Sequence, residues 1–122
     1  MKRITLFIMF SLLLSVNVFA SRRSIALNRK GMLANHGEFF APADMPEVYY
    51  DSDTQEIIIE ADGFSTYYDV DIISQSTLLA VISTQISGYG DNIDVSLLPD
   101  DNYIIVITSE FDNEYEGYFT NY

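Results

Sequence analysis

Four aspartates in two predicted turns carry the chemistry that this sequence suggests most directly, which is binding of a hard cation. Asp51 and Asp53 lie in one turn, and Asp100 and Asp101 lie in another. Carboxylate oxygens are the ligands that calcium prefers in proteins. If the predicted strands alternate in direction, both turns lie at the same end of the fold, and the four carboxylates can converge there. A weak calcium site is therefore one interpretation.

A simpler interpretation of these residues is that they form turns, because aspartate is favoured in turns. A complete EF-hand loop is excluded. If such a loop began at Asp51, its sixth and twelfth positions would hold Glu56 and Asp62 instead of glycine and glutamate. Residues 57–59 between them also have the composition of a strand.

The sequence predicts no enzyme, no catalytic residue and no cofactor. A catalytic serine needs a neighbouring base, but the only histidine, His36, lies in the predicted N-terminal arm, and there is no cysteine. Lys30, the only lysine after the leader, lies in the same arm. Carboxylate pairs suited to glycoside hydrolysis arise by chance among 18 acidic residues.

Residues 1–20 have the pattern of a secretory signal peptide. Lys2 and Arg3 precede an apolar run over 4–14, and Val18-Phe19-Ala20 supplies small residues at the cleavage positions. The apolar run is too short to cross a bilayer comfortably, so we expect no stable membrane insertion after cleavage. The expected location is secreted or periplasmic, in a Gram-negative envelope.

The charge of the chain is strongly segregated. Four bases, Arg22, Arg23, Arg29 and Lys30, lie after the leader, whereas 31–122 holds all 18 acids and no lysine or arginine. Such a body repels nucleic acid. The partners that it favours are a basic protein or a neutral glycan, and plain solubility is the simpler use of the acids.

The hydrophobic pattern predicts an all-β protein. Residues 21–45 read as a flexible basic-to-polar arm, in which Ile25-Ala26-Leu27 is one short edge strand at most, and 46–122 reads as the folded domain. Seven strands are expected, with alternating apolar residues and turn residues between them. They span 47–50, 56–60, 65–73, 78–86, 91–95, 102–109 and 114–120. Short strands at this spacing predict a single seven-stranded antiparallel immunoglobulin-like sandwich.

The corner Leu98-Pro99-Asp100-Asp101-Asn102-Tyr103, followed by a β-branched strand, resembles a pattern of Bacteroidetes secreted proteins. The whole layout is similar to small secreted Bacteroidales proteins of unknown function, which have an immunoglobulin-like sandwich. The corner also resembles, more weakly, the C-terminal sorting domains of type IX secretion cargo. The resemblance implies the fold and no activity.

Two departures from this pattern matter. Asp101 stands where glycine is usual, so we expect it to adopt a glycine-like backbone conformation. The basic residues that sorting domains carry near their end are missing. Leu98 and Pro99 are expected to plug the corner. Tyr103 is expected to face inward as a tyrosine corner, with its hydroxyl bonded to nearby backbone.

The sequence therefore predicts an envelope-associated, non-enzymatic binding module, and a sorting or structural appendage is the alternative. The recognition surface is expected to be acidic and to carry partly exposed tyrosines, which suit a basic protein surface or a sugar face. Packing under the arm is their other interpretation. The candidates are Tyr49 or Tyr50, Tyr67, Tyr89 and Tyr118.

Overall fold

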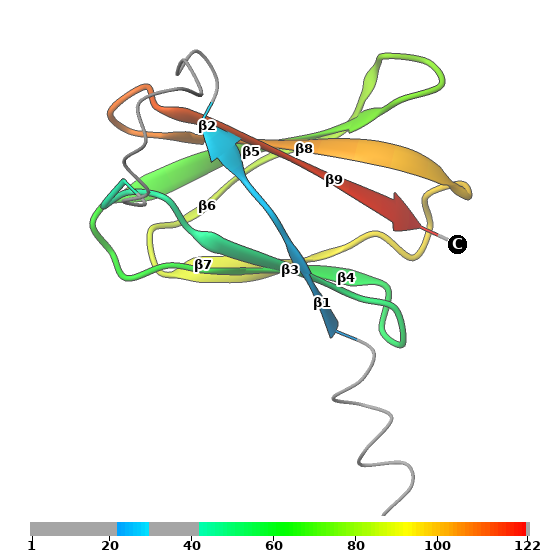
Figure 1. Ribbon diagram of the computed structural model, residues 1–122, viewed down its shortest axis with the longest axis horizontal. Helices are drawn as coiled ribbons and strands as arrows, with labels where there is room; N and C mark the ends of the chain where they lie inside the picture. Colours follow the sequence, from blue (N-terminus) through cyan, green and yellow to red (C-terminus); the bar gives the residue numbers. More distant parts are fainter. Residues whose placement is uncertain (1–21, 30–41, 122) are drawn as a thin grey trace, which may run out of the picture.

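The computed structural model describes residues 22–29 and 42–121, and this part of the chain is entirely β-structure and connections (Figure 1). Nine strands are present in it. They are β1 (Arg22–Ile25), β2 (Asn28–Arg29), β3 (Glu47–Asp51), β4 (Glu56–Glu60), β5 (Tyr67–Ser74), β6 (Ala80–Ser87), β7 (Gly90–Asp94), β8 (Asp101–Ser109) and β9 (Glu114–Asn121).

The strands form two sheets that face one another as a sandwich. The four-stranded sheet has the order β1-β3-β4-β7, and the five-stranded sheet has the order β2-β9-β8-β5-β6. Every strand pair is antiparallel. The all-β sandwich expected from the sequence is thus confirmed, with nine strands instead of seven.

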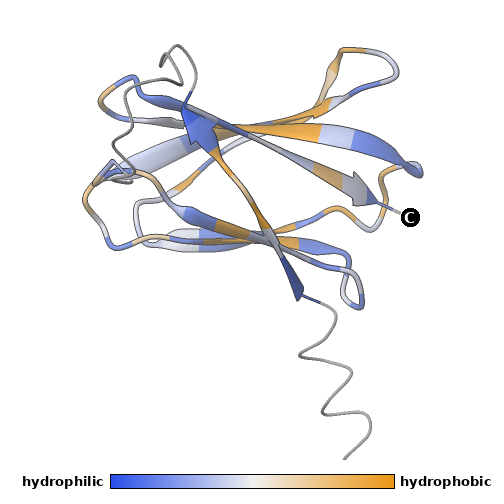
Figure 2. Ribbon diagram, viewed as in Figure 1, coloured by the Kyte–Doolittle hydropathy of each residue, from blue (hydrophilic) through white to orange (hydrophobic). Residues whose placement is uncertain are grey.

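The core lies between the sheets and follows from the alternation along each strand. Tyr68, Val70 and Ile72 of β5 point inward and are fully or almost fully buried, whereas Asp69 between them is exposed. Strand β8 repeats the pattern, with Tyr103 inward as predicted. Figure 2 shows hydrophobic residues along the middle of most strands and hydrophilic residues in many of the turns. With no cysteine in the chain, this core stabilises the domain without disulfides.

The two additional strands come from residues that the sequence analysis placed in the irregular arm. Strand β1 pairs with β3, and β2 pairs with β9, so the N-terminal segment passes from one sheet to the other (Figure 1). The crossing is close at Gly117 of β9. A Cβ atom there would lie 2.7 Å from Ile25 Cγ2 and 3.2 Å from the Ala26 carbonyl oxygen. Only glycine gives the segment this room.

The β5–β6 hairpin projects beyond the rest of the sandwich (Figure 1). Its turn differs from the expected strand start at 78, because Leu78 has a φ of +60° and strand pairing resumes only at Ala80. The register shifts between Ile72 and Ile73, which marks a bulge at the base of the hairpin. Most of β6 is exposed to solvent, because it is an edge strand of the five-stranded sheet.

Candidate functional site

The four predicted cation ligands lie at one end of the sandwich, but each pair serves its own turn. Asp51 is buried and caps the β3–β4 turn, since its Oδ1 accepts hydrogen bonds from the backbone N–H groups of Asp53 (3.0 Å) and Thr54 (3.3 Å). Its Oδ2 lies 3.7 Å from Arg22 Nε. Asp53 itself is exposed.

Asp101 binds a different part of the structure. Its Oδ2 accepts hydrogen bonds from the hydroxyls of Ser74 and Ser76, both at 2.6 Å, which joins the start of β8 to the β5–β6 hairpin. These two bonds, Ser74 first, lower the pKa of the Asp101 carboxyl. The neighbouring Asp100 is exposed.

The expected glycine-like conformation at Asp101 is wrong. Asp101 begins β8, pairs with Asn121 and is not among the non-glycine residues with positive φ, which in the described ranges are Gln55, Leu78 and Asp112. The side-chain bonds to two serines hold Asp101 in an ordinary strand conformation, so the corner needs no left-handed residue there.

Within 22–29 and 42–121, no three acidic or histidine side chains gather as a group that could hold a metal ion. Asp51 ends β3 of the four-stranded sheet and Asp101 begins β8 of the five-stranded sheet, and their carboxylates accept hydrogen bonds from N–H and hydroxyl donors. The structure thus brings the four aspartates to one end without bringing their carboxylates together.

Tyr103 forms the hydrogen bond expected of a tyrosine corner. Tyr103 is buried, and its hydroxyl donates a hydrogen bond to the Pro99 carbonyl oxygen at 2.5 Å. Burial raises the pKa of this phenol. The ring stacks on Phe119 at 5.4 Å, and Leu98 packs partly buried against the core. Leu98 and Tyr103 therefore close the sandwich at this end, whereas Pro99, which was expected to plug the corner with Leu98, is exposed and contributes its carbonyl.

Asn121, which the sequence did not single out, completes that closure. It is fully buried, and its Nδ2 donates to the carbonyls of Val95 (3.0 Å) and Leu98 (3.3 Å). Its Oδ1 accepts from the Tyr50 hydroxyl (2.7 Å) and from Gln55 Nε2 (3.3 Å). The buried polar groups at this end of the sandwich are thus held by hydrogen bonds within the fold.

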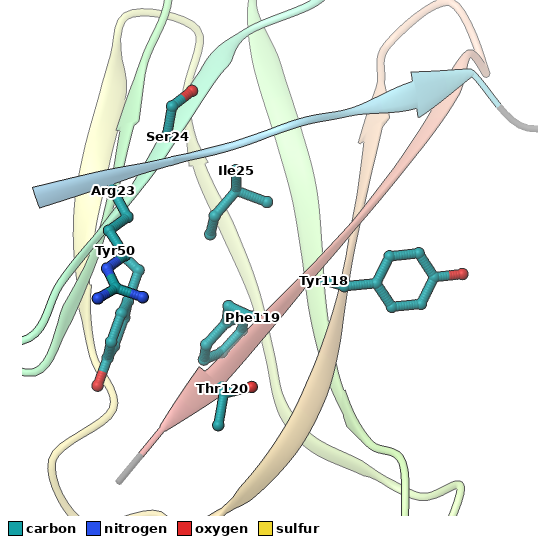
Figure 3. Close-up of a pocket in the computed structure, with 7 residues that line it drawn as sticks. All are labelled: Arg23, Ser24, Ile25, Tyr50, Tyr118, Phe119 and Thr120. Atoms are coloured by element: carbon teal, nitrogen blue, oxygen red, sulfur yellow. The ribbon is translucent and has the colours of Figure 1, made fainter.

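A hollow of about 380 Å³ lies along the seam between β1 and β9 (Figure 3). Its floor consists of core side chains, among them Ile25, Tyr50 and Phe119, and Arg23 lies beside Tyr50. The two strands diverge here after their close crossing at Gly117, which accounts for the space. Ser24, Tyr118 and Thr120 also line the hollow, and we assign it to the seam between the two sheets.

At the opposite end of the sandwich, three connections are joined by hydrogen bonds of the backbone and of the Ser65 hydroxyl. The Gly63 N–H donates to the Gly88 carbonyl (3.0 Å), and the Gly88 N–H donates to the Thr66 carbonyl (2.9 Å). The buried Ser65 hydroxyl donates to the Tyr67 carbonyl (2.6 Å) and accepts from the Glu110 N–H (3.1 Å). The β4–β5, β6–β7 and β8–β9 connections thus form one hydrogen-bonded base.

Three aromatic side chains stand exposed on this base, and we call them the aromatic end. Phe64 is 56% exposed, Phe111 is 52% exposed and Tyr89 is 75% exposed. The Phe64 and Phe111 ring centroids are 5.7 Å apart. Tyr89 lies against Gly63, where an added Cβ would come within 2.7 Å of its ring. Each ring comes from a different connection, so the surface exists only in the folded chain.

Carboxylates accompany these rings. Asp62 lies two residues before Phe64, where its Oδ1 accepts the Phe64 N–H at 3.2 Å, and Glu110 and Asp112 flank Phe111 in the chain. No lysine or arginine occurs between 31 and 122. The nearest described base is Arg29, which donates to Asn113 Oδ1 at 2.5 Å. The aromatic end is therefore apolar and acidic together.

The buried carboxylate of Asp44 binds the β8–β9 connection, which is part of this base. Asp44 is 3% exposed and accepts hydrogen bonds from Ser109 Oγ (2.6 Å), Asn113 Nδ2 (2.7 Å) and the Tyr115 hydroxyl. The Tyr68 hydroxyl donates to the Asp44 backbone carbonyl at 2.8 Å. Burial raises the pKa of Tyr68 to about 12. This network fixes the segment before β3 to the β8–β9 connection.

The sequence singled out only Tyr89 of the aromatic end. Of the other tyrosines expected to be partly exposed, Tyr118 is exposed, Tyr49 and Tyr67 are partly exposed, and Tyr50, the alternative to Tyr49, is buried. Phe64 and Phe111 were missed. The available signal was a phenylalanine beside turn-forming residues, as in Asp62-Gly63-Phe64 and Glu110-Phe111-Asp112, where a buried side chain is not expected.

Comparison with known proteins finds a solved structure with a similar fold. No family model matches the sequence, and no curated protein matches it significantly. A solved structure of a DUF3244 family protein from Bacteroides vulgatus, with an immunoglobulin-like β-sandwich fold, is similar at a TM-score of 0.65 and 16% identity. The match covers 83% of this chain and 99% of that chain. The resemblance to Bacteroidales immunoglobulin-like proteins is confirmed at the level of the fold.

The described residues also contain no helix of sufficient length and hydrophobicity to cross a membrane.

Proposed function

We propose that this protein is a secreted or periplasmic, non-enzymatic binding module that recognises lysine- or arginine-bearing protein segments through its aromatic end. The observation that carries the proposal is the exposure of Phe64, Tyr89 and Phe111 on three connections joined by hydrogen bonds. Loops clustered at one end of an immunoglobulin-like sandwich are the usual place for recognition residues.

Rigidity supports recognition at this end. Exposed aromatic rings bring a large contact area and lose few side-chain rotamers on binding, so they act as anchors in interfaces. Here the backbone beneath them is fixed by the Gly63–Gly88 bond and by Ser65, which reduces the ordering that a partner must induce. Nothing among the described residues covers the three rings, and stability alone gives no reason to expose them.

Charge supports a cationic partner. Lysine and arginine place their ammonium or guanidinium groups over aromatic faces and lay their aliphatic stems along apolar surface. Carboxylates of Asp62, Glu110 and Asp112 stand near the rings to neutralise the charge. Two of the three rings are phenylalanines, which offer no hydroxyl to a sugar, so a basic segment fits better than a neutral glycan.

The extracytoplasmic, non-enzymatic part of the proposal is supported by sequence. The signal-peptide pattern over 1–20 indicates export, and the absence of cysteine together with a single histidine gives little material for nucleophilic catalysis.

The experiment is selection of a phage-displayed library of random twelve-residue peptides on immobilised mature protein, residues 21–122. Enriched peptides should contain arginine and lysine, and their affinity should fall as salt is added, because exposed charge pairs are screened. Amide shifts in an ¹⁵N NMR titration with an enriched peptide should concentrate at 61–66, 88–89 and 110–113.

The matched variants compare exposed apolar side chains at the two ends. The double change Phe64→Ala and Phe111→Ala should reduce binding by about a hundredfold, in line with loss of two aromatic anchors. Leu97→Ala should leave binding unchanged, since Leu97 is 95% exposed at the other end. Enrichment of uncharged peptides, selective binding on a glycan array, or equal effects of the two variants would refute the proposal.

A further inference from the structure

Strand β6 forms a free edge of the five-stranded sheet. Within the described strands, β5 pairs with one side of β6 and nothing pairs with the other side. The hairpin turn before it projects from the sandwich (Figure 1), and all residues of β6 except Ile82 and Ile86 are exposed. A row of backbone N–H and C=O groups is thus open to pairing over 80–87.

This edge carries none of the charges that ordinarily protect such edges. Residues 72–90 contain no acid or base, in a chain with 18 acids between 31 and 122. The other edge strands are all charged: β1 contains Arg22 and Arg23, β2 contains Arg29, and β7 contains Asp91 and Asp94. Charged residues at sheet edges prevent edge-to-edge association, and only β6 omits them.

Hydrophobic residues extend along the same element. Leu78 and Leu79 at the hairpin turn are 74% and 67% exposed, and Val81 at the bulge is also exposed. Figure 2 shows these hydrophobic segments in the projecting hairpin, away from the core. The sequence of β6, AVISTQIS, is rich in β-branched residues and suits pairing on both sides.

We propose that two copies of this protein associate through β6, which pairs antiparallel with its counterpart, so that the two five-stranded sheets become one continuous sheet. The inference goes beyond the proposed function and uses a different surface. It rests on the free edge and on its missing charge, not on the aromatic end.

A second copy is the occupant that these observations favour. An antiparallel strand pair about a twofold axis is self-complementary, so β6 itself supplies the matching edge. The two acidic molecules can approach here because β6 itself carries no acid, and the acids of the neighbouring strand, Asp69 and Asp71, lie on β5. The Asp69 carboxylate accepts a hydrogen bond from Gln85 Nε2 at 3.2 Å. Across the new pair, the two β5 backbones would be three strand spacings apart, about 14 Å, which exceeds the screening length of about 8 Å at physiological salt.

The first test is a single-cysteine scan of the mature protein, which natively has no cysteine. Cysteine is placed in turn at Val81, Ser83, Thr84 and Gln85, and the covalent dimer formed under mild oxidation is quantified. In a symmetric antiparallel pair only the residue at the twofold axis faces its own copy at about 5 Å. One position should therefore crosslink strongly and its neighbours weakly. Ser24→Cys on the charged β1 edge is the control and should not crosslink.

The second test is sedimentation equilibrium over a concentration series, with Ser83→Glu against Ser24→Glu. Ser83→Glu should weaken dimerisation by at least about tenfold, because the symmetry brings two new carboxylates to one interface, where each lies across from Asp71 of its own β5. Ser24→Glu should leave it unchanged, and circular dichroism should confirm that both variants fold. Adding salt should strengthen the dimer. A monomer at all concentrations, equal effects of the two glutamates, a ladder of larger species, or crosslinking at Ser24→Cys would overturn the proposal.

Discussion

At the scale of single residues, the acidic side chains that stand out in the sequence are used by the chain itself. The Asp51 carboxylate is occupied by two backbone N–H groups, and the Asp101 carboxylate by two serine hydroxyls. Local sequence predicted that these residues lie in turns, but the serine partners of Asp101 come from 27 and 25 residues away. Such long-range partners determine the surroundings of a carboxylate, and no local pattern shows them.

Tyr103→Phe tests the corner. The change removes the hydroxyl that donates to Pro99 but keeps the ring stacked on Phe119, so the free energy of unfolding should fall by about 1 kcal/mol. Urea unfolding followed by circular dichroism measures it. The matched control is Tyr118→Phe, whose exposed hydroxyl bonds Glu116 at 2.9 Å and should matter little. Equal stability of Tyr103→Phe and the wild type would count against the corner.

Asp44 should give the protein an acid-sensitive stability. Burial by itself raises the pKa of the Asp44 carboxyl, but hydrogen bonds from Ser109, Tyr115 and Asn113 outweigh it and hold that pKa below its usual value. A lowered folded-state pKa means that the stabilisation is complete above the unfolded value of 3.8 and is lost as the pH falls through the folded value.

Asp44→Asn should therefore lower the free energy of unfolding at pH 7 by about 2 kcal/mol, because it replaces a charged acceptor of three hydrogen bonds. Urea unfolding between pH 2 and 7 should also show a shallower loss of stability in acid for the variant. Asp53→Asn, at an exposed position, is the control. An unchanged acid slope in Asp44→Asn would contradict this role of the carboxylate.

At the scale of elements, the seven strands from β3 to β9 were predictable because each has either an alternation of its own or, as in β4, a short β-branched run bounded by turn residues. Strand β5 shows it plainly, with Tyr68, Val70 and Ile72 inward and Asp69 outward. Strands β1 and β2 were not predictable in this way. Strand β1 buries only Ile25, and β2 is two residues long, so both owe their structure to pairing with β3 and β9.

Gly117→Val tests that pairing. The new side chain would collide with Ile25 and with the Ala26 carbonyl, so β1 and β2 should separate from β9 at a cost of roughly 1–3 kcal/mol. Hydrogen–deuterium exchange should show faster exchange at 22–29 while β4 and β8 stay protected. Thr120→Val, on the same strand, should keep the wild-type pattern. Protection of 22–29 in Gly117→Val would exclude the close crossing.

The aromatic end is formed by three connections, and its position in the fold could not be predicted from the sequence. Phe64, Tyr89 and Phe111 lie in three separate connections, and each looks like an isolated aromatic in a turn. Their neighbourhood arises only because Gly63, Gly88 and Ser65 bind those connections to one another. Sequence composition predicted an acidic surface with aromatic residues, but only the tertiary structure gives its location.

At the scale of the whole molecule, the acids repel one another. Residues 31–122 carry 18 acids and no lysine or arginine, and self-repulsion of this kind destabilises a compact state. Raising sodium chloride from low concentration to about the physiological 0.15 M shortens the screening length. The melting temperature of the mature protein should therefore rise by several degrees, as scanning calorimetry would measure. A melting temperature that falls with salt would mean that attractive charge pairs dominate.

The pairing of β2 with β9 has a consequence for the order of folding. Asn28 lies beside Glu116, so almost the first and almost the last described residues of the sandwich are neighbours. A chain that emerges from a ribosome or a pore with its N-terminus first holds β2 without a partner until nearly all of it has passed. Closing such a long loop comes late and is slow. The N-terminal strands therefore pair last, and the sandwich is complete only after the C-terminal strand β9 has formed.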